Sequence, residues 1–313
     1  TSMNGPDPWH GSCQLQFLST EHGTIHQGGC SAPFKLLRAD QGDDGRCELP
    51  LLHTAGGLVG GDRLNIDLTL RPNSRALMTS VAAQKVYGSV GRSQLHPQGA
   101  WSYQSVTGSL QPGSDLEWLP QELVLYADAL LEQQLRVTLP LDASFLSAEI
   151  VRLGRTAAGE TLERGCWRSS LALQRSDGDD HHWEMVDRLE LGGSSLESVH
   201  GLAGAPVFGT LVWAAPMHLD KTTMTSLLEG AREDRCGLAG VMHCGALRQG
   251  LVARYTGHSS RDARFWFSRI WSRTRSLRGL QPARIPRVWP LQEEPLRRQT
   301  FTSNAQTATA GTN

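Results

Sequence analysis

His53-Thr54-Ala55-Gly56-Gly57-Leu58-Val59-Gly60-Gly61-Asp62-Arg63 opens the stretch of sequence, residues 53–87, around which the chain is organised. Apolar and polar residues alternate over residues 64–70, and this period of two predicts a β-strand with one buried face. Residues 71–74, Arg-Pro-Asn-Ser, have turn chemistry, because proline presets φ and asparagine tolerates the left-handed region. Residues 76–80 are apolar again. We therefore expect a β-hairpin preceded by a glycine-rich loop.

The two glycine pairs of this loop do not fit a nucleotide-binding loop. A dinucleotide fingerprint needs G-x-G-x-x-G between a strand and a helix, and this segment has neither that spacing nor a helix after it. A P-loop ends in Gly-Lys-Ser/Thr, whereas Gly61 is followed by Asp62, an anion where phosphate would lie. Glycine at these positions indicates positive φ or close approach of two backbone segments.

Several motifs in this order resemble those of the urease accessory protein family called UreD, or UreH in some species. They are Gly56–Asp62 (GGLVGGD), Leu77–Tyr87 (LMTSVAAQKVY), Trp118–Glu122 (WLPQE), Leu153–Glu160 (LGRTAAGE) and Pro286–Trp289 (PRVW). The chain departs from the family pattern at Thr54-Ala55, where proline is common, and in residues 80–84. These departures concern individual polar contacts within the motifs.

The resemblance implies a non-enzymatic scaffold or chaperone that takes part in nickel delivery and metallocentre assembly in apo-urease. Its implied partners are the urease subunits, a helical UreF-type accessory protein and, through that protein, a UreG-type GTPase. Nickel would be in transit, with no tightly bound cofactor. The implied fold is elongated and mostly β, with a few helices.

Composition is typical of a protein without a nucleic-acid or membrane partner. The net charge is −1, so no strong global field attracts polyanions. Only three of the 30 basic residues are lysines, and arginine-rich surfaces favour the bidentate contacts to carboxylates found at protein interfaces. No apolar run could span a bilayer, and no signal peptide is evident in residues 1–11. We therefore expect a cytoplasmic protein.

Six cysteines lie far apart in the sequence, without C-x-x-C or another paired spacing. We therefore expect reduced thiols, as in the cytosol.

The remaining sequence predicts a mainly β fold of stacked, mostly antiparallel sheets with about two helices toward the C-terminus. Turn residues separate short apolar segments at the spacing typical of sandwiches and related stacked sheets. Residues 219–233 and 260–278 predict helices, because apolar residues recur on one face and an N-capping residue precedes each. We expect an irregular segment over residues 1–12, a single β-rich domain over 13–296 and a disordered polar tail over 297–313. The predicted strands cover residues 13–18, 24–26, 34–38, 64–70, 76–80, 101–106, 115–119, 123–126, 135–139, 145–153, 167–174, 183–191, 196–199 and 207–213.

Charged residues within the motifs suggest a polar interior passage: Asp62, Lys85, Glu122, Arg155 and Glu160. Lys85 lies in an apolar context, and a buried ammonium needs a carboxylate partner. One reading is a structural ion-pair network. The functional reading is a hydrated route for a divalent cation, because carboxylates and water hold such ions weakly whereas thiolate clusters would trap them.

The predicted C-terminal helix suggests a partner interface. Trp266 and Trp271 contribute to its apolar stripe, and Arg269 and Arg273 belong to a cationic side. Tryptophan and arginine are enriched at interface hot spots. We therefore expect these four residues at or beside a partner interface.

Metal-ligand candidates are sparse. Cys236, His243 and Cys244 follow a predicted helix and could converge in a loop, although a buried thiol beside an exposed imidazole explains them as well. His22, His26 and Cys30 recur every four residues, but the intervening glycines argue against a helix that would align them. A self-sufficient metal-storage chaperone thus stays an alternative, as does a β-sandwich hydrolase, although no nucleophile elbow or metalloprotease motif occurs.

Overall fold

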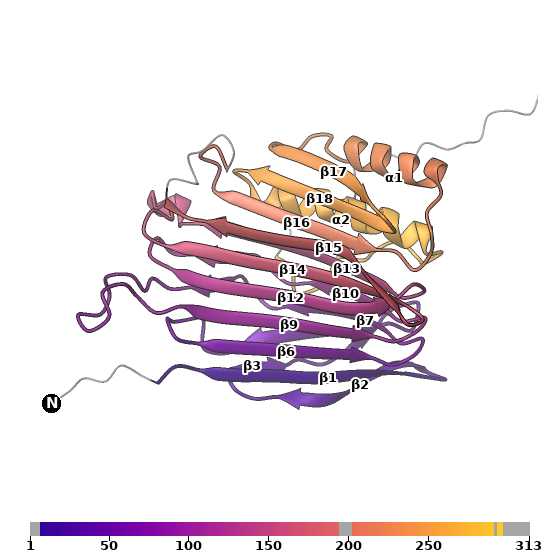
Figure 1. Cartoon of the computed structure of the whole chain (residues 1–313), viewed down its shortest axis with the longest axis horizontal. Coiled ribbons are helices and arrows are strands. Elements are labelled where there is room, and N and C mark those ends of the chain that lie inside the picture. The colour runs from indigo at the N-terminus through magenta and orange to yellow at the C-terminus, as the bar shows by residue number, and fades with distance from the viewer. Residues whose placement is uncertain (1–6, 194–201, 291–292, 297–313) are drawn as a thin grey trace, which may run out of the picture.

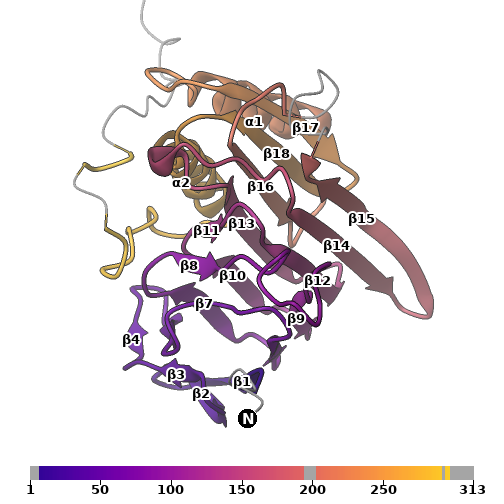
Figure 2. The same cartoon turned by 90° about the vertical axis from the view of Figure 1, so that its left-hand side faces the viewer.

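The computed structural model describes residues 7–193, 202–290 and 293–296 and confirms a mainly β fold. Two large sheets lie face to face, and two helices near the C-terminus pack on the outer side of one of them (Figures 1 and 2). The strand predicted for residues 196–199 and the polar tail predicted for residues 297–313 lie outside the described residues. The first strand begins at His10, before the predicted start at residue 13.

The seven-stranded sheet forms one layer of the molecule. In spatial order it contains β15 (Asp180–Leu191), β14 (Cys166–Asp177), β12 (Leu130–Pro140), β9 (Ser102–Leu110), β6 (Arg63–Leu70), β1 (His10–Thr20) and β2 (Gly23–Cys30).

The eleven-stranded sheet forms the second layer. Its main path contains β17 (Val241–Leu247), β18 (Gly250–Gly257), β16 (Val207–Ala214), β13 (Ser144–Leu153), β10 (Asp115–Leu119), β7 (Arg75–Ser80), β5 (Cys47–His53) and β3 (Phe34–Leu36). The short strands β4 (Asp40–Gln41), β8 (Gln84–Val86) and β11 (Leu123–Leu125) pair beside this path. A 3-10 turn, η1 (Thr156–Ala158), follows β13.

The expectation of mostly antiparallel sheets is wrong, because the central strands of both sheets pair in parallel. The cause is the path of the chain, which passes from one sheet to the other between β6 and β7, between β9 and β10, and between β12 and β13. Strands that are neighbours in a sheet are therefore not consecutive in sequence. The turn at residues 71–74 has the predicted left-handed Asn73, with φ 61°, but it connects the two sheets and closes no hairpin.

The glycine loop before β6 needs its glycines for the predicted reasons. Gly56 and Gly61 have φ of 77° and 97°. A side chain on Gly57 would meet the Lys85 carbonyl oxygen at 2.8 Å, and one on Gly60 would meet the Ala100 carbonyl oxygen at 2.9 Å. The loop thus crosses neighbouring backbone too closely for any larger residue.

Two hydrophobic cores hold the fold together. One fills the space between the sheets, and the other lies between the eleven-stranded sheet and the helices α1 (Lys221–Glu233) and α2 (Ser260–Leu277). Helix α2 begins as predicted, with Ser259 as N-cap accepting a hydrogen bond from the Asp262 backbone nitrogen at 3.0 Å. Side chains of β13 alternate between the two cores. Leu146 and Ala148 pack against the helices, and Val151 packs against the other sheet.

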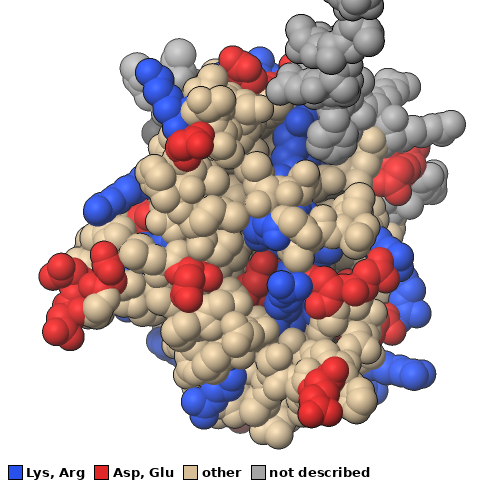
Figure 3. All heavy atoms as spheres, turned by 90° about the vertical axis from the view of Figure 1, so that its right-hand side faces the viewer, with Lys and Arg blue, Asp and Glu red and all other residues tan. Residues whose placement is uncertain are grey.

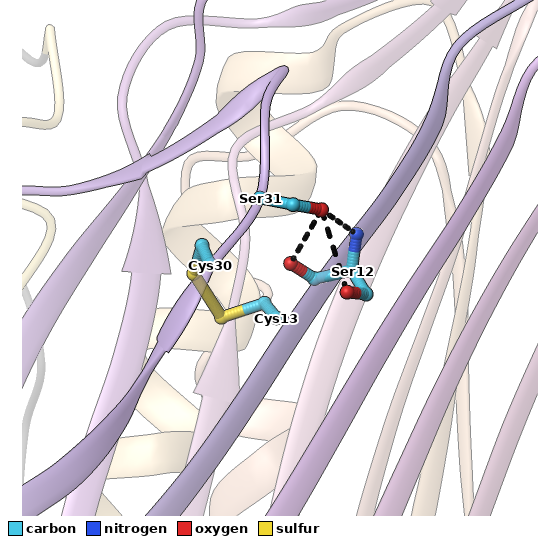
Figure 4. Close-up of a disulfide and its surroundings, with 4 residues drawn as sticks. All are labelled: Ser12, Cys13, Cys30 and Ser31. Carbon is cyan, nitrogen blue, oxygen red and sulfur yellow. Dashed lines mark hydrogen bonds between the residues drawn. A yellow bond between two sulfur atoms is a disulfide. The ribbon is translucent and has the colours of Figure 1, made fainter.

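Cys13 and Cys30 form a disulfide, so the expectation of reduced thiols is wrong for this pair (Figure 4). The two residues lie directly opposite each other in the antiparallel pair of β1 and β2, with Cα atoms 4.1 Å apart. Ser12 and Ser31 flank them, and the Ser12 backbone nitrogen donates to the Ser31 hydroxyl. Sequence spacing gave no sign of this pair because the register of the hairpin, not a motif, brings the thiols together.

The hairpin of β17 and β18 was not predicted, and it is the largest omission in the described chain. Its outer strand β17 is mostly exposed or half-buried, so its apolar alternation is weak. No described helix is long and apolar enough to cross a membrane.

Candidate functional site

A cavity of about 50 Å³ lies between the two sheets and crosses the strands from β15 and β16 toward β9. Its lining is mixed, because amides, hydroxyls and carboxylates lie beside apolar side chains such as Val106, Leu135 and Phe208. Its polar lining residues are Gln84, Gln104, Gln121, Gln133, Gln134, Ser147, Glu149, Ser169, Ser170, Asp187 and Thr210.

A second cavity of about 200 Å³ continues the first toward β3 and β5. Gln84, Gln104, Pro120 and Gln121 line both cavities, so the two are adjacent. Both volumes exceed the roughly 10–15 Å³ that one water needs, and the walls supply polar partners for water. The two adjacent cavities therefore form a hydratable stretch, with polar groups in its walls, inside the otherwise apolar space between the sheets.

Glu149 is the acidic group that β13 turns into the first cavity. Its Oε1 accepts a hydrogen bond from Trp118 Nε1 at 3.0 Å. Burial raises the pKa of Glu149, although the Trp118 hydrogen bond opposes that rise. No ion pair to Glu149 occurs among the described residues. Glu149 is half-buried, and a carboxylate that faces an interior cavity without a counter-ion is costly, so it marks a site where a cation or a proton would balance the charge.

Sequence analysis missed Glu149, although a signal was present. Glu149 is the acidic residue of the mostly apolar strand β13 (Ser144–Leu153), on the face that carries Ser147. Charged residues are rarely placed in the interior face of a strand without a partner or a role.

His53, at the end of β5, lines the second cavity. Neither ring nitrogen has a hydrogen-bond partner in the described structure, and both are shielded from solvent. Burial lowers the pKa of His53, with Asp62 opposing the effect. The amide oxygen of Gln104, which lines the same cavity, also lacks a partner among the described residues.

The predicted passage residues do not gather at one place. Asp62 is buried and holds the glycine loop, since its two carboxylate oxygens each accept a hydrogen bond of 2.8 Å, from the backbone nitrogens of Trp9 and Val59. Lys85 lines the second cavity, but its side chain is exposed, so the expected buried ammonium is wrong. Because β8 turns Val86 inward, its neighbour Lys85 points outward.

Arg155 and Glu160 pair with each other at the surface beside η1, where Arg155 also stacks over Tyr126. Glu122 follows β10 and lines a separate cavity of about 160 Å³ together with Arg264 and Trp289. Burial lowers the pKa of Arg264 to about 10. Gln121 lines this cavity as well as the two between the sheets, so the Trp118–Glu122 motif reaches all three.

The predicted interface residues of α2 lie inside the protein. Trp266 and Trp271 are fully buried, and Trp266 Nε1 donates to the Ala231 carbonyl oxygen at 2.8 Å. Arg269 is buried and donates to the carbonyl oxygens of residues 234, 236 and 295, while Arg273 pairs with Asp234. These side chains form no accessible face in this chain, and their role beside an interface stays a prediction.

Trp271 also joins a buried network that ties α2 to the eleven-stranded sheet. Its indole nitrogen donates to Glu117 on β10, and Glu117 pairs with Arg46, Arg275 and Arg278. Burial alone would raise the pKa of Glu117, but the three guanidinium groups hold it well below its usual value. The network is structural, because Asp115 and Asp44 add carboxylates that pair with Arg46 and Arg278, so three acids balance the three arginines.

The three predicted metal ligands near β17 do not converge on a common point. Cys236 lies in the turn after α1, and His243 and Cys244 are adjacent on β17, where successive side chains point to opposite faces. Cys244 contacts the Leu228 carbonyl oxygen, and burial raises the pKa of its thiol. Within residues 7–193, 202–290 and 293–296, no group of three or more His, Cys, Asp or Glu side chains could hold a metal ion.

The sequence matches the family model described as UreD urease accessory protein over residues 10–290. The chain belongs to the UreD family. It is 72% identical to the urease accessory protein UreD of Synechococcus sp. (strain CC9605) over 310 residues, which cover 99% of this chain and all of that protein. It is 70% identical to the UreD of Parasynechococcus marenigrum (strain WH8102) over the same shares and 56% identical to that of Prochlorococcus marinus (strain MIT 9303) over 93% of this chain and all of that protein.

Family membership confirms the resemblance drawn from the sequence motifs. This UreD family member is an accessory protein of urease and not itself the enzyme. Basic and acidic side chains are interspersed over the face seen in Figure 3.

Proposed function

We propose that this chain conducts nickel toward apo-urease through the hydratable space between its two sheets. The supporting observation is Glu149, a carboxylate without a counter-ion in a polar interior cavity. Amide, hydroxyl and water oxygens around one carboxylate hold a divalent cation weakly and let it exchange, whereas imidazole and thiolate clusters bind nickel more firmly. Such a lining favours transit over storage.

The chain would work as a bridge in the cytoplasm, between urease and a helical UreF-type protein that carries a UreG-type GTPase. The glycine loop supports this division of labour, because the Asp62 carboxylate accepts from the Val59 backbone nitrogen within the loop and from that of Trp9 outside it, where a nucleotide loop would bind phosphate. Nucleotide hydrolysis would therefore come from the GTPase.

The passage is tested by in vitro activation of apo-urease with the complete accessory complex. Glu149→Gln keeps an oxygen that can accept the Trp118 hydrogen bond but removes the negative charge. We expect at least 10-fold slower activation by the Glu149→Gln complex. The matched control is Glu21→Gln, an exposed residue between β1 and β2, which should activate at the wild-type rate.

The assembly is tested separately by size-exclusion chromatography of the chain with the UreF-type protein, the GTPase and apo-urease. We expect one complex that contains both urease and the GTPase, and loss of that link when this chain is omitted. Equal activation by both glutamine variants in a stable complex would contradict the passage, and a urease–GTPase link that forms without this chain would contradict the bridge.

A further inference from the structure

The segments that lead into the parallel strands of the seven-stranded sheet lie at one end of the molecule. The strands β1, β6, β9, β12 and β14 run side by side in the same direction. The segments before them therefore emerge together, at the left of Figure 1 and toward the viewer in Figure 2. Three of these segments, residues 7–9, the glycine loop at 56–61 and residues 88–101, form what we call the entry face.

Each segment of the entry face exposes a large apolar side chain. Trp9 is 45% exposed, Val59 is 50% exposed and Leu95 is 86% exposed. Leu95 is the most exposed of the large apolar side chains that the structure describes. Single exposed apolar residues are common on soluble proteins, whereas several that gather at one place mark an interaction site.

Hydrogen bonds hold the three segments together. The Asp62 carboxylate joins two of them, because its oxygens accept from the backbone nitrogens of Trp9 and Val59, each at 2.8 Å. The third segment joins them beside Val59, where the Ser102 hydroxyl donates to the Val59 carbonyl oxygen at 3.0 Å. The three exposed apolar side chains are thus carried by one connected unit.

The loop that carries Leu95 is ordered by its own hydrogen bonds. The Ser89 hydroxyl closes its base, since it accepts from the Ala100 backbone nitrogen at 2.7 Å and donates to the Ala100 carbonyl oxygen at 2.9 Å. Nearer the tip, the Ser93 hydroxyl accepts from the Leu95 backbone nitrogen at 3.2 Å. Compact loops with closed ends are frequently functional, and a loop that is ordered in advance loses less conformational entropy on binding.

The charge beside this loop is positive. Residues 88–101 contain Arg92 and no acidic residue. Arg92 and Arg164 both pair with the Asp128 carboxylate, at 3.1 Å each. The two arginine side chains are 65% and 63% exposed, whereas that of Asp128 is 7% exposed, so solvent meets mainly the positive charge of this cluster. A surface with carboxylates around an apolar pocket would complement it.

We propose that the entry face docks apo-urease, with Leu95 inserted into an apolar pocket that carboxylates of a urease subunit surround. The proposal rests on the bridge described above and names the surface through which the chain meets urease. Gly56 and Gly57 of the glycine loop line the second cavity, so a subunit docked here lies beside one end of the hydratable stretch. Trp9 and Val59 supply the apolar contacts around the anchor.

The docking is tested by measuring the affinity of the full-length chain for purified apo-urease. Leu95→Ser should weaken binding at least 10-fold, because a buried apolar anchor carries much of the binding energy of an interface. Arg92→Gln should weaken it two- to fivefold and reduce its dependence on salt. The matched control is Ile25→Ser, which removes an exposed aliphatic side chain near the far end of β1 and should bind as wild type does. Thermal unfolding establishes that each variant is folded.

A photoreactive benzoylphenylalanine in place of Leu95 identifies the occupant in the assembled complex. We expect a crosslink to a urease subunit. A crosslink only to the helical UreF-type protein or to a second copy of this chain would overturn the proposal, as would wild-type affinity of Leu95→Ser for apo-urease. The bridge itself fails if urease and the GTPase associate without this chain. If that association needs the chain but tolerates Leu95→Ser, the bridge stands and this docking surface does not.

Discussion

Trp118 donates its indole N–H to Glu149 across neighbouring strands β10 and β13, at 3.0 Å, and thereby orients a carboxylate between the sheets. Trp118 and Glu149 are 31 positions apart in sequence. Trp118 lines one cavity and Glu149 the other. The pair therefore lies where the two cavities meet, and a cation that moved between them would pass beside it.

Replacing Glu149 should make the protein more stable while it impairs nickel transfer. A carboxyl whose folded-state pKa is raised destabilises the fold at pH values above its unfolded pKa, because ionisation is then less favourable in the folded state. We expect Glu149→Gln to raise Tm at pH 7 by about 1–3 °C, and this gain to shrink as pH falls toward 4.5. Thermal unfolding at several pH values measures it. A lower Tm at pH 7 would show that the charge of Glu149 is compensated.

Removing Glu117 should have the opposite effect on stability. Glu117 pairs with Arg46, Arg275 and Arg278, and Asp115 also pairs with Arg46 and Arg278, so Glu117→Ala leaves mainly Arg275 without its ion-pair partner among the described residues. We expect a loss of about 3–5 kcal/mol in the free energy of unfolding, measured by urea denaturation. The control Glu229→Ala, on the exposed side of α1, should stay within about 0.5 kcal/mol of wild type.

The same network predicts sensitivity to acid. Arginine neighbours hold the pKa values of Asp115 and Glu117 below their ordinary values, against the opposing effect of burial. Their contribution to stability is therefore complete above the unfolded-state pKa values of about 4 and is lost as pH falls through the lower folded-state values. Urea denaturation between pH 7 and pH 3 should show a decline that starts near pH 4.5. The decline should be shallower in Glu117→Gln, and equal slopes in both proteins would contradict this account.

Arg269 should be required for folding and not only for partner binding. Its guanidinium donates to three backbone carbonyl oxygens and orders the chain on both sides of α2. We expect Arg269→Ala to lower the free energy of unfolding by about 2–4 kcal/mol, because buried carbonyls lose charged donors. Arg284→Ala removes an exposed arginine and serves as the control. If Arg269→Ala had wild-type stability but no longer bound the helical partner, Arg269 would act at a partner interface, as the sequence suggested.

Lys85 should contribute little to stability despite its apolar sequence context. The structure places its side chain in solvent at the outer strand β8. Lys85→Ala should change the free energy of unfolding by no more than about 0.5 kcal/mol. A loss of several kcal/mol in chemical denaturation would indicate a buried carboxylate partner after all.

Local patterns predicted much of the fold, and the path of the chain accounts for the errors. The alternation over residues 64–70 gave a correct strand, and the capping serine gave the correct start of α2. The turn at residues 71–74 was interpreted as a hairpin because turn chemistry is the same whether the chain returns within a sheet or crosses to another. The parallel strands show no fixed sequence repeat. Ile66, Val106, Leu135 and Leu171 lie side by side on neighbouring strands of one sheet, but they are unequally spaced along the sequence.

The candidate site was harder to predict because burial, not residue type, defines it. Motif membership drew attention to Arg155 and Glu160, which pair with each other at the surface. Neither Glu149 nor His53 belongs to the sequence motifs that resemble the family. Only the packing of the two sheets reveals that these residues line a cavity. An acid on the inward face of a mostly apolar strand was the sequence signal available for Glu149.

The central claim is that nickel crosses the space between the sheets past Glu149, and the rate of nickel transfer tests it most directly. Radioactive nickel loaded on the GTPase can be followed into apo-urease within the assembled complex. The account predicts transfer through Glu149→Gln at least 10-fold slower than through wild type or Glu21→Gln, with equal amounts of complex. Equal transfer rates for all three proteins would contradict it.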